Sequence, residues 1–148
     1  MLSRFEQFAT SITCIYRYIQ KIERMEMEQY GLKGPHAQCL LAMSRYPEGI
    51  TAARLCEICD KDKAAVSRMV AELEEKELLL RDTVGGVRYR ARLKLTAKGL
   101  AAAEHVSRRA QLAVEEASSG MTDQQRIAMY GALDLIAGNL HTICTEGL

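Results

Sequence analysis

Positively charged side chains are concentrated in one short stretch of this sequence. Residues 81–98 contain six Lys or Arg residues against a single acidic residue, Asp82, although the whole chain has a formal net charge of only +1. Closely spaced cations of this kind either neutralise the phosphates of a nucleic acid or form an ordinary solvated surface. Because the charge is confined to one region, we interpret the stretch as a polyanion-binding surface.

The spacing of these charges is that of a β-strand. Within residues 87–95, apolar residues alternate with four cations, Arg88, Arg90, Arg92 and Lys94. A period of two predicts a half-buried strand, and Gly85-Gly86 predicts a hairpin turn that pairs it with residues 79–83. Like charges along one face repel each other, so the ladder favours a nucleic acid, with Arg88 nearest to an adjacent minor groove. The alternative is an exposed edge strand whose charges prevent aggregation.

A second candidate for recognition lies just upstream, in a helix predicted from Asp62 to about Leu78. Its apolar face consists of Val66, Met69, Val70 and Leu73. Its opposite face carries small and cationic side chains at Lys63, Ala64, Ser67, Arg68 and Ala71. A helix about 10–12 Å wide fits the major groove, where Arg pairs with guanine and Ser with a base or phosphate. The alternative is an ordinary surface helix.

Further helices must position these two elements. Helical periodicity, caps and turn residues predict helices over about 3–30, 35–46, 51–58, 62–78 and 96–117, and a last helix that starts at Thr122. The first has an apolar stripe of Phe5, Phe8, Ile12, Ile15, Tyr16, Ile19 and Ile22. The fifth has a stripe of Leu100, Ala103, Val106, Ala110, Ala113 and Ala117. We therefore predict a mainly α fold with a small β-hairpin wing.

Length and composition limit the function classes. The 148 residues, 48% of them hydrophobic and 26% charged, suit one soluble domain with a core. The N-terminal residues include charged side chains at positions where a signal peptide would have its apolar segment. No apolar stretch reaches the ~20 residues that a membrane-spanning helix needs. We therefore expect a cytoplasmic protein with no membrane partner. No phosphate loop, nucleophile elbow or catalytic carboxylate pair is apparent, so we expect neither an enzyme nor a cofactor.

Cysteine and histidine spacing suggests weaker alternatives. Cys56-x-x-Cys59 could bind a metal or act as a redox pair, but zinc needs four ligands and no second pair has suitable spacing. We expect these two cysteines to pack as small apolar residues and predict no metal site. His36 either lines an effector pocket or is a partly exposed histidine.

Three segments together resemble the MarR family of transcriptional regulators. They are Leu55–Arg68 (LCEICDKDKAAVSR), the downstream Leu73, Lys76 and Leu78, and the closing Leu93–Gly99 (LKLTAKG). Members typically have a recognition helix of the form D-K-x-x-V-S-R and a wing that closes on L-T-x-x-G. The sequence departs from the family where Glu77 replaces a common Gly, and where Val87-Arg88-Tyr89 lacks the Asp of an Asp-x-Arg near the wing tip.

The resemblance implies one MarR-like domain over residues 1–148, a winged helix-turn-helix flanked by N- and C-terminal dimerisation helices. Residues 35–98 would form the winged-helix DNA-binding region, and residues 1–31 and 99–148 the dimerisation helices. A homodimer would bind a pseudo-palindromic operator on double-stranded DNA, usually as a repressor, and a small effector or an oxidant would release it. The expected DNA-contacting residues are Thr51, Arg54, Lys61, Lys63, Ala64, Ser67, Arg68, Arg81, Arg88, Arg90 and Arg92.

Two other functions remain open at this point. A winged-helix module could use its basic wing to bind an acidic protein rather than DNA. A thiol- or metal-sensing regulator could use Cys14, which resembles the reactive cysteine of oxidation-sensing family members but lies more than a turn later, or Cys56 and Cys59.

Overall fold

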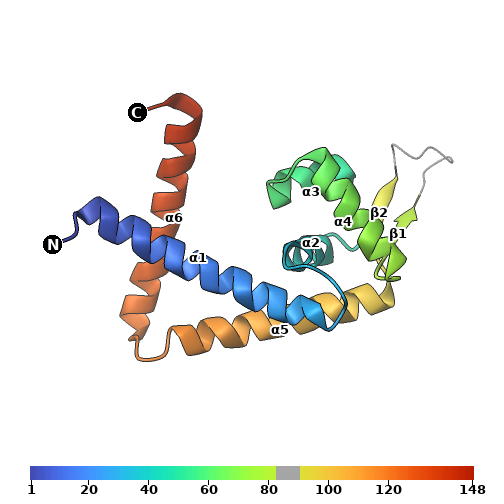
Figure 1. Cartoon of the computed structure of the whole chain (residues 1–148), viewed down its shortest axis with the longest axis horizontal. Helices are drawn as coiled ribbons and strands as arrows, with labels where there is room; N and C mark the ends of the chain where they lie inside the picture. Colours follow the sequence, from blue (N-terminus) through green and yellow to red (C-terminus); the bar gives the residue numbers. More distant parts are fainter. Residues whose placement is uncertain (83–90) are drawn as a thin grey trace. The chain divides into compact units, whose positions relative to one another are not determined.

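The computed structural model describes residues 1–82 and 91–148. Its elements are α1 (Arg4–Glu28), α2 (Pro35–Ser44), α3 (Ala52–Cys59), α4 (Lys63–Glu75), β1 (Leu79–Asp82), β2 (Arg92–Leu95), α5 (Ala97–Ala117) and α6 (Asp123–Glu146) (Figure 1). This order confirms the mainly α fold with a small antiparallel hairpin. The chain divides into two compact units, Met1–Arg109 and Ala110–Leu148, with the boundary inside α5.

Local capping interactions define the starts of the helices. Ser3 and Thr122 each form a capping box with the residue three positions later, and Thr51 and Asp62 accept hydrogen bonds from the backbone N–H groups of Arg54 and Ala65. Pro35 is the first residue of α2, where its missing N–H costs no helical hydrogen bond. These helix starts agree with the sequence prediction because each cap is encoded within four residues.

Helix α4 ends three residues earlier than its periodicity predicts. Glu77 adopts a left-handed conformation with φ of +61°, and its N–H donates to the Glu74 carbonyl. The Leu78 N–H donates to the Leu73 carbonyl, and Leu78 is buried. These bonds form a Schellman motif, whose left-handed position usually carries Gly. The chain therefore turns into β1 at a residue where Gly would remove a steric cost.

The two strands form an antiparallel sheet in which Leu79 pairs with Leu95 and Asp82 with Arg92. A third strand contributes a single residue: Ile50 donates to and accepts from the Leu93 backbone, at 3.0 and 2.8 Å. This bridge joins the wing to the start of α3, and no periodicity in the sequence predicts it. The predicted turn at Gly85-Gly86 lies outside the described residues, as does the strand prediction over 87–90.

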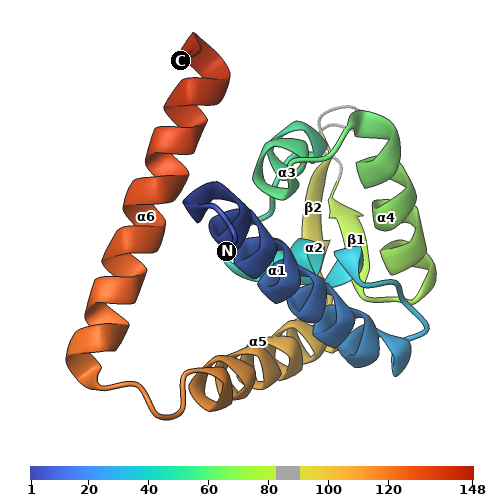
Figure 2. The same cartoon turned by 60° about the vertical axis from the view of Figure 1, so that its left-hand side comes forward.

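The buried core of the first unit surrounds this sheet. Figures 1 and 2 both show α2, α3 and α4 gathered beside β1 and β2. The largest fully buried side chains come from these elements and from the end of α1, and they include Met27, Leu40, Met43, Leu55, Val66, Leu73 and Leu93. The winged-helix region therefore has an apolar core within a single chain.

The start of α5 is fixed tightly against the end of α4. Thr96 donates a 2.7 Å hydrogen bond from its hydroxyl to the Glu77 carbonyl and accepts one from the Gly99 N–H at 3.0 Å. A Cβ atom at Gly99 would lie 1.9 Å from the Leu78 carbonyl oxygen. The L-T-x-x-G segment thus combines a helix cap with a close backbone contact that only Gly permits.

The buried face of α5 contains only part of the predicted stripe, because Ala103 and Val106 are buried, Ala113 is half-buried, and Ala110 and Ala117 are exposed. Gly99, Ala102, Ala103 and Val106 are its buried residues, whereas Leu100 is 47% exposed. Periodicity placed Leu100 in the stripe, but periodicity alone could not decide which edge of the stripe faces the core of this chain. The close approach at Gly99 turns the small residues inward and Leu100 outward.

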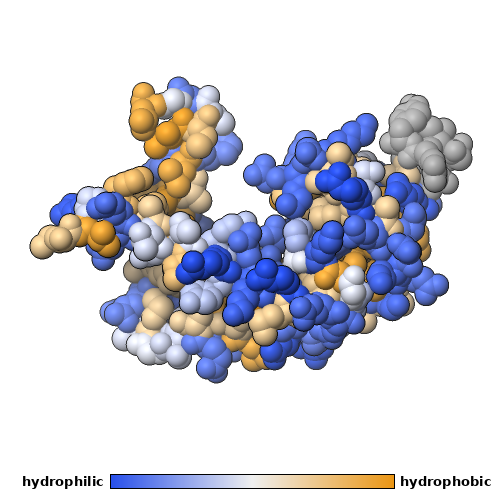
Figure 3. All heavy atoms as spheres, viewed as in Figure 1, coloured by the Kyte–Doolittle hydropathy of each residue, from blue (hydrophilic) through white to orange (hydrophobic). Residues whose placement is uncertain are grey.

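Helix α6 buries none of its residues within the chain. Its exposed apolar side chains include Ile127, Tyr130, Leu133, Leu135, Leu140 and Ile143. The surface of α6 in Figure 3 is accordingly rich in orange, apolar atoms. By length and composition alone α6 could also cross a membrane, contrary to the expectation from the sequence that no stretch qualifies. The predicted apolar stripe of α1 is likewise exposed, from Phe5 at 76% to Ile22 at 39%.

Candidate nucleic-acid interface

Helix α4 presents the face that the sequence predicts. Val66, Met69, Val70 and Leu73 are buried. The opposite side is exposed at Lys63, Ala64, Ser67, Arg68 and Ala71. Neither Lys63 nor Arg68 forms an ion pair with another described residue, so both cations are free to meet an anion. The surface over α3 and α4 is mostly hydrophilic (Figure 3).

The amino end of α4 is open to solvent and well capped. Asp62 is exposed, and its carboxylate accepts a 2.7 Å hydrogen bond from the Ala65 N–H. Helix N-termini attract phosphate through the free N–H groups and the helix dipole. One backbone donor is already bound to Asp62, so added attraction for phosphate must come mainly from Lys63 and from Lys61, which is half-buried.

The preceding helix contributes less free charge. Thr51 is exposed, but its hydroxyl is engaged as the cap of α3. Arg54 is also exposed, and its guanidinium forms a 2.8 Å ion pair with Glu57. A pair so exposed is screened and weak, so the guanidinium could exchange Glu57 for a phosphate at small cost.

The described part of the wing carries one free cation. Arg92 is exposed and lies opposite Asp82 in the strand register. The Lys94 ammonium, on the same face, lies 3.1 Å from the Asp82 carboxylate. The predicted ladder of like charges is thus partly neutralised at its base. Its outer members Arg88 and Arg90 lie outside the described residues.

Arg81 lies on the other face of the sheet. It pairs directly with Leu93, which is buried, and its guanidinium forms a 3.2 Å ion pair with Glu74 of α4. The structure therefore does not bring Arg81 together with Arg92. The alternation of the sequence contained this information, because Leu79 and Arg81 must share a face and Leu79 is apolar.

His36 is buried within the first unit. It is 2% exposed, and its Nε2 lies 2.9 Å from a Glu72 carboxylate oxygen, although the angle is too poor for a hydrogen bond. Its Nδ1 lies 3.1 Å from the backbone N–H of Lys33. This corrects the expectation that His36 is partly exposed. It packs between α2 and α4.

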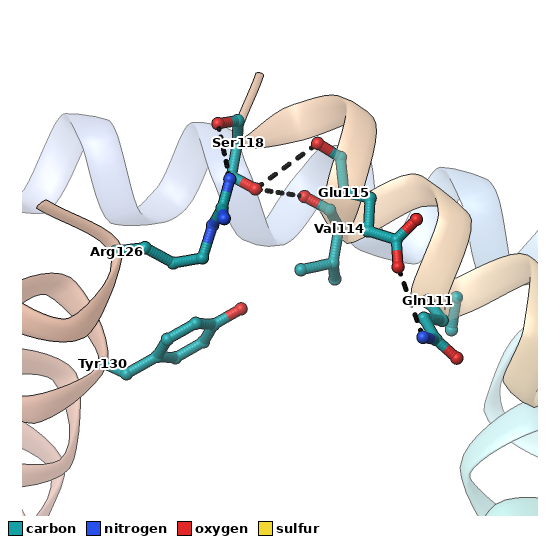
Figure 4. A pocket seen from close by; sticks show the side chains of 7 residues that line it. Gln111, Val114, Glu115, Ser118, Arg126 and Tyr130 are labelled. Carbon is teal, nitrogen blue, oxygen red and sulfur yellow. Dashed lines mark hydrogen bonds between the residues drawn. The ribbon is translucent and has the colours of Figure 1, made fainter. Parts of the chain in front are cut away.

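Surface pockets lie in both units of the chain. One, of about 510 Å³, lies in the second unit where α5 meets α6, and its lining includes Ser118, Arg126 and Tyr130 (Figure 4). The other, of about 430 Å³, lies between α2, α3 and α5 of the first unit. Its lining consists of Gln38, Leu41, Ser44, Arg45, Ile58, Cys59 and Ser107. The lining of neither pocket includes the exposed face of α4. The described residues contain no group of three or more potential metal ligands.

Comparison with known proteins agrees with this geometry. A model described as the MarR family matches residues 30–86, which include α2, α3, α4 and β1. Over these residues the chain is similar to the MarR family of transcriptional regulators. It is similar to a Thauera aromatica protein described as a candidate transcriptional regulatory protein for the hcr operon, with 26% identity over 132 residues, 89% of this chain and 70% of that protein.

Solved MarR-type structures share the fold along nearly the whole chain. A MarR transcriptional regulator from Methanosarcina mazei Go1 is 24% identical and superposes with a TM-score of 0.82, covering 96% of this chain and 94% of that one. A Listeria monocytogenes protein assigned to the MarR family and solved with a 26mer DNA is 19% identical, with a TM-score of 0.79 over 100% and 98% of the two chains. These likenesses confirm the winged-helix fold predicted from the sequence.

Proposed function

We propose that this protein is a MarR-like, sequence-specific DNA-binding regulator of transcription that places α4 in the major groove. The observation that carries the proposal is the division of α4 into a buried apolar face and an exposed face with small and cationic side chains. Ala64 and Ala71 allow close approach to the bases, and Arg68 can pair in bidentate fashion with guanine. The Listeria monocytogenes relative that was solved with DNA supports the same chemistry.

The remaining candidate residues would hold the backbone of the duplex. Lys61, Lys63 and Ser67 flank Arg68 and are suited to phosphate contacts. Thr51 and Arg54 would contact phosphate at the start of α3, and Arg92 would do so from the base of the wing. We retain Arg88 and Arg90 as wing contacts on the sequence argument. Arg81 is the weakest member of the set, because Glu74 already neutralises it.

The protein would act as a homodimer through its terminal helices. Exposed apolar side chains run along α1 from Phe5 to Ile22, and α6 has no buried residue, so the stripe of α1 and the whole of α6 remain uncovered within the chain. A second copy supplies a matching apolar surface. A membrane suits α6 less well, because Asp134, Asn139 and His141 would enter the hydrocarbon. A dimer would set two copies of α4 about 34 Å apart, one turn of a pseudo-palindromic operator.

Repression, release by a small effector and a cytoplasmic location complete the proposal, and they rest on the family resemblance. A dimer seated on an operator blocks the transcription machinery, and an effector that favours another spacing of the two α4 helices would release it. The geometry requires neither catalysis nor a cofactor, because binding alone performs the proposed task.

Selection of bound sequences from a random DNA pool tests this function. We expect recovery of an imperfect palindrome whose half-sites are about one turn apart. Mobility shifts on that sequence should show that Arg68→Ala loses about 1–3 kcal/mol of binding free energy and relaxes the base preference at one position in each half-site. Arg108→Ala is the matched control, because it removes the same charge from an exposed site on α5. If no motif were enriched and an acidic protein bound the wing instead, the chain would be a protein-interaction module.

A further inference from the structure

A buried histidine of α2 faces a carboxylate of α4. His36 is the second residue of α2 and is 2% exposed. Its Nε2 lies 2.9 Å from a carboxylate oxygen of Glu72, whose side chain is 40% exposed. Among the described residues Nε2 has no hydrogen bond of good geometry, so its interaction with this carboxylate is electrostatic. The contact joins the first turn of α2 to the helix that carries the candidate DNA-binding face.

The other ring nitrogen of His36 decides where the proton of the neutral imidazole lies. Nδ1 is 3.1 Å from both the backbone nitrogen and the backbone oxygen of Lys33. The Lys33 carbonyl already accepts the His36 backbone N–H, so we assign the Lys33 N–H as the donor and Nδ1 as its acceptor. An imidazole that accepts at Nδ1 carries its proton on Nε2. The buried Nε2–H therefore attracts the Glu72 carboxylate, because a buried donor without an acceptor is costly.

Glu72 has a competing partner on its own helix. Arg68 lies four residues before Glu72, a spacing at which oppositely charged side chains of a helix pair with each other. Arg68 is exposed, and it forms no ion pair with another described residue. The carboxylate that could neutralise Arg68 lies against His36 instead. The contact with the imidazole thus leaves the Arg68 guanidinium uncommitted.

We propose that His36 is a positioning residue for DNA reading, which holds the Glu72 carboxylate on the α2 side of α4 and so keeps Arg68 free for a base. The inference rests on the proposed function, because that function assigns the base contact to Arg68. Without the imidazole N–H, Glu72 would be free to pair with Arg68 and would neutralise the guanidinium. The discrimination between bases would then fall together with the affinity for DNA.

Nitrogen-15 NMR of the full-length protein tests the contact without DNA. The chain has three histidines, so substitutions of His105 and His141 identify the remaining side-chain signals as those of His36. At mildly alkaline pH we expect the tautomer with the proton on Nε2, and a shift of the Nε2 resonance in Glu72→Gln. Glu75→Gln is the matched control, because it removes a carboxylate from an exposed site on α4 and should leave the resonance in place. A proton on Nδ1, or an Nε2 resonance that Glu72→Gln does not move, would overturn the proposal.

Mobility shifts on the selected DNA test the consequence for binding. His36→Phe keeps a planar ring but removes the N–H, and we expect it to weaken binding about three- to tenfold. It should also reduce discrimination against DNA altered at the base pair whose preference Arg68→Ala relaxes. In the Glu72→Gln background, His36→Phe should change neither quantity, because no carboxylate is left to be released. His36→Gln retains an N–H donor and should bind more tightly than His36→Phe.

Urea unfolding distinguishes this role from simple packing. His36→Phe should lose similar stability with and without Glu72→Gln, although affinity falls only where Glu72 is present. Equally weak binding by the single and double variants would mean that His36 acts through packing, which would contradict the proposal. Unchanged binding by His36→Phe would also contradict it, since the released carboxylate would then pair elsewhere, for instance with Lys76. His36→Leu supplies the same comparison if the Phe variant does not fold.

The two measurements separate this inference from the proposed function. If the unmodified chain bound no DNA, the proposed function would be wrong, and the NMR spectra would still decide whether His36 holds Glu72. If Arg68→Ala relaxed the base preference and His36→Phe did not, the proposed function would stand and the positioning role would be refuted.

Discussion

The winged-helix region and helix α6 differ in whether their apolar residues are buried within the chain. From α2 to β2 the apolar side chains are buried within the chain and cations lie on the outside of α4. In α6, by contrast, large apolar side chains are exposed and nothing is buried. The first region is complete as a folded unit and presents a polar surface, whereas α6 presents an apolar surface that is incomplete without a partner.

This contrast indicates two kinds of partner. An exposed, hydrophilic face with unpaired cations suits a polyanion, since charge attracts it without a deep pocket. A long apolar helix suits another apolar surface, since burial contributes about 25 cal/mol per Å² of apolar area removed from water. The contrast therefore agrees with the proposed DNA binding at one region and the proposed self-association at the other.

The largest effect is expected from breaking the apolar surface of α6. The double substitution Leu133→Glu with Leu140→Glu places two charges at exposed apolar sites that a dimer would bury. Light scattering should show the mass of a monomer, and affinity for the selected palindrome should fall more than about 100-fold as one half-site is lost. Asn139→Glu, on another face of α6, is the control. A double variant that remained dimeric would contradict the assignment of α6.

A second substitution disturbs the close backbone contact between the start of α5 and Leu78, beside the core of the winged-helix region. Gly99→Ala would place a methyl group 1.9 Å from the Leu78 carbonyl oxygen, so the backbone must move. We expect the free energy of unfolding in urea to fall by about 1–3 kcal/mol or more. Gly131→Ala in α6 is the matched control, since nothing lies within 4 Å of its added Cβ. It should be neutral or stabilising by up to about 1 kcal/mol. If Gly99→Ala and Gly131→Ala changed the free energy of unfolding equally, the backbone near Gly99 would have moved to accommodate the methyl group without cost.

A substitution in the wing tests the cationic surface of the winged-helix region, with a smaller expected effect on DNA affinity. Arg92→Ala should weaken binding several-fold on every DNA sequence and reduce the slope of log affinity against log salt by about one, because a phosphate contact carries no base preference. Mobility shifts at several salt concentrations measure both quantities, with Arg108→Ala as the control. A change in base preference instead would place Arg92 in a groove rather than on the backbone.

The smallest effect is expected at the end of α4. Glu77→Gly relieves a left-handed conformation that costs a non-Gly residue roughly 1–2 kcal/mol, less the entropy that Gly adds to the unfolded chain. The net gain should be below about 1 kcal/mol in urea unfolding. Glu75→Gly, one residue before the cap and inside the helix, should instead destabilise. A loss of stability in Glu77→Gly would mean that the Glu side chain stabilises the turn.

Much of this fold could be predicted from the sequence because its signals are local. Ser3, Thr51, Asp62 and Thr122 each begin a helix through hydrogen bonds that span three residues. The two faces of α4 followed from a 3.6-residue period that the core respects. The end of α4 could not be predicted in the same way, because Glu77 adopts the turn conformation without the Gly that signals it.

The remaining features depend on contacts between distant segments. The bridge between Ile50 and Leu93 leaves no periodic trace in the sequence. The neutralisation of Lys94 by Asp82 required the strand register. The sequence therefore indicated which residues are charged, and tertiary structure was needed to show which of them are free.

Hydroxyl-radical footprinting of the protein on the selected DNA is the most direct test of the central claim, that α4 enters the major groove. The account predicts two protected segments centred about 10 base pairs apart, on one face of the duplex. Both segments should be lost together in Arg68→Ala and retained in Arg108→Ala. A continuous footprint without this period, or one that Arg68→Ala leaves unchanged, would contradict the claim.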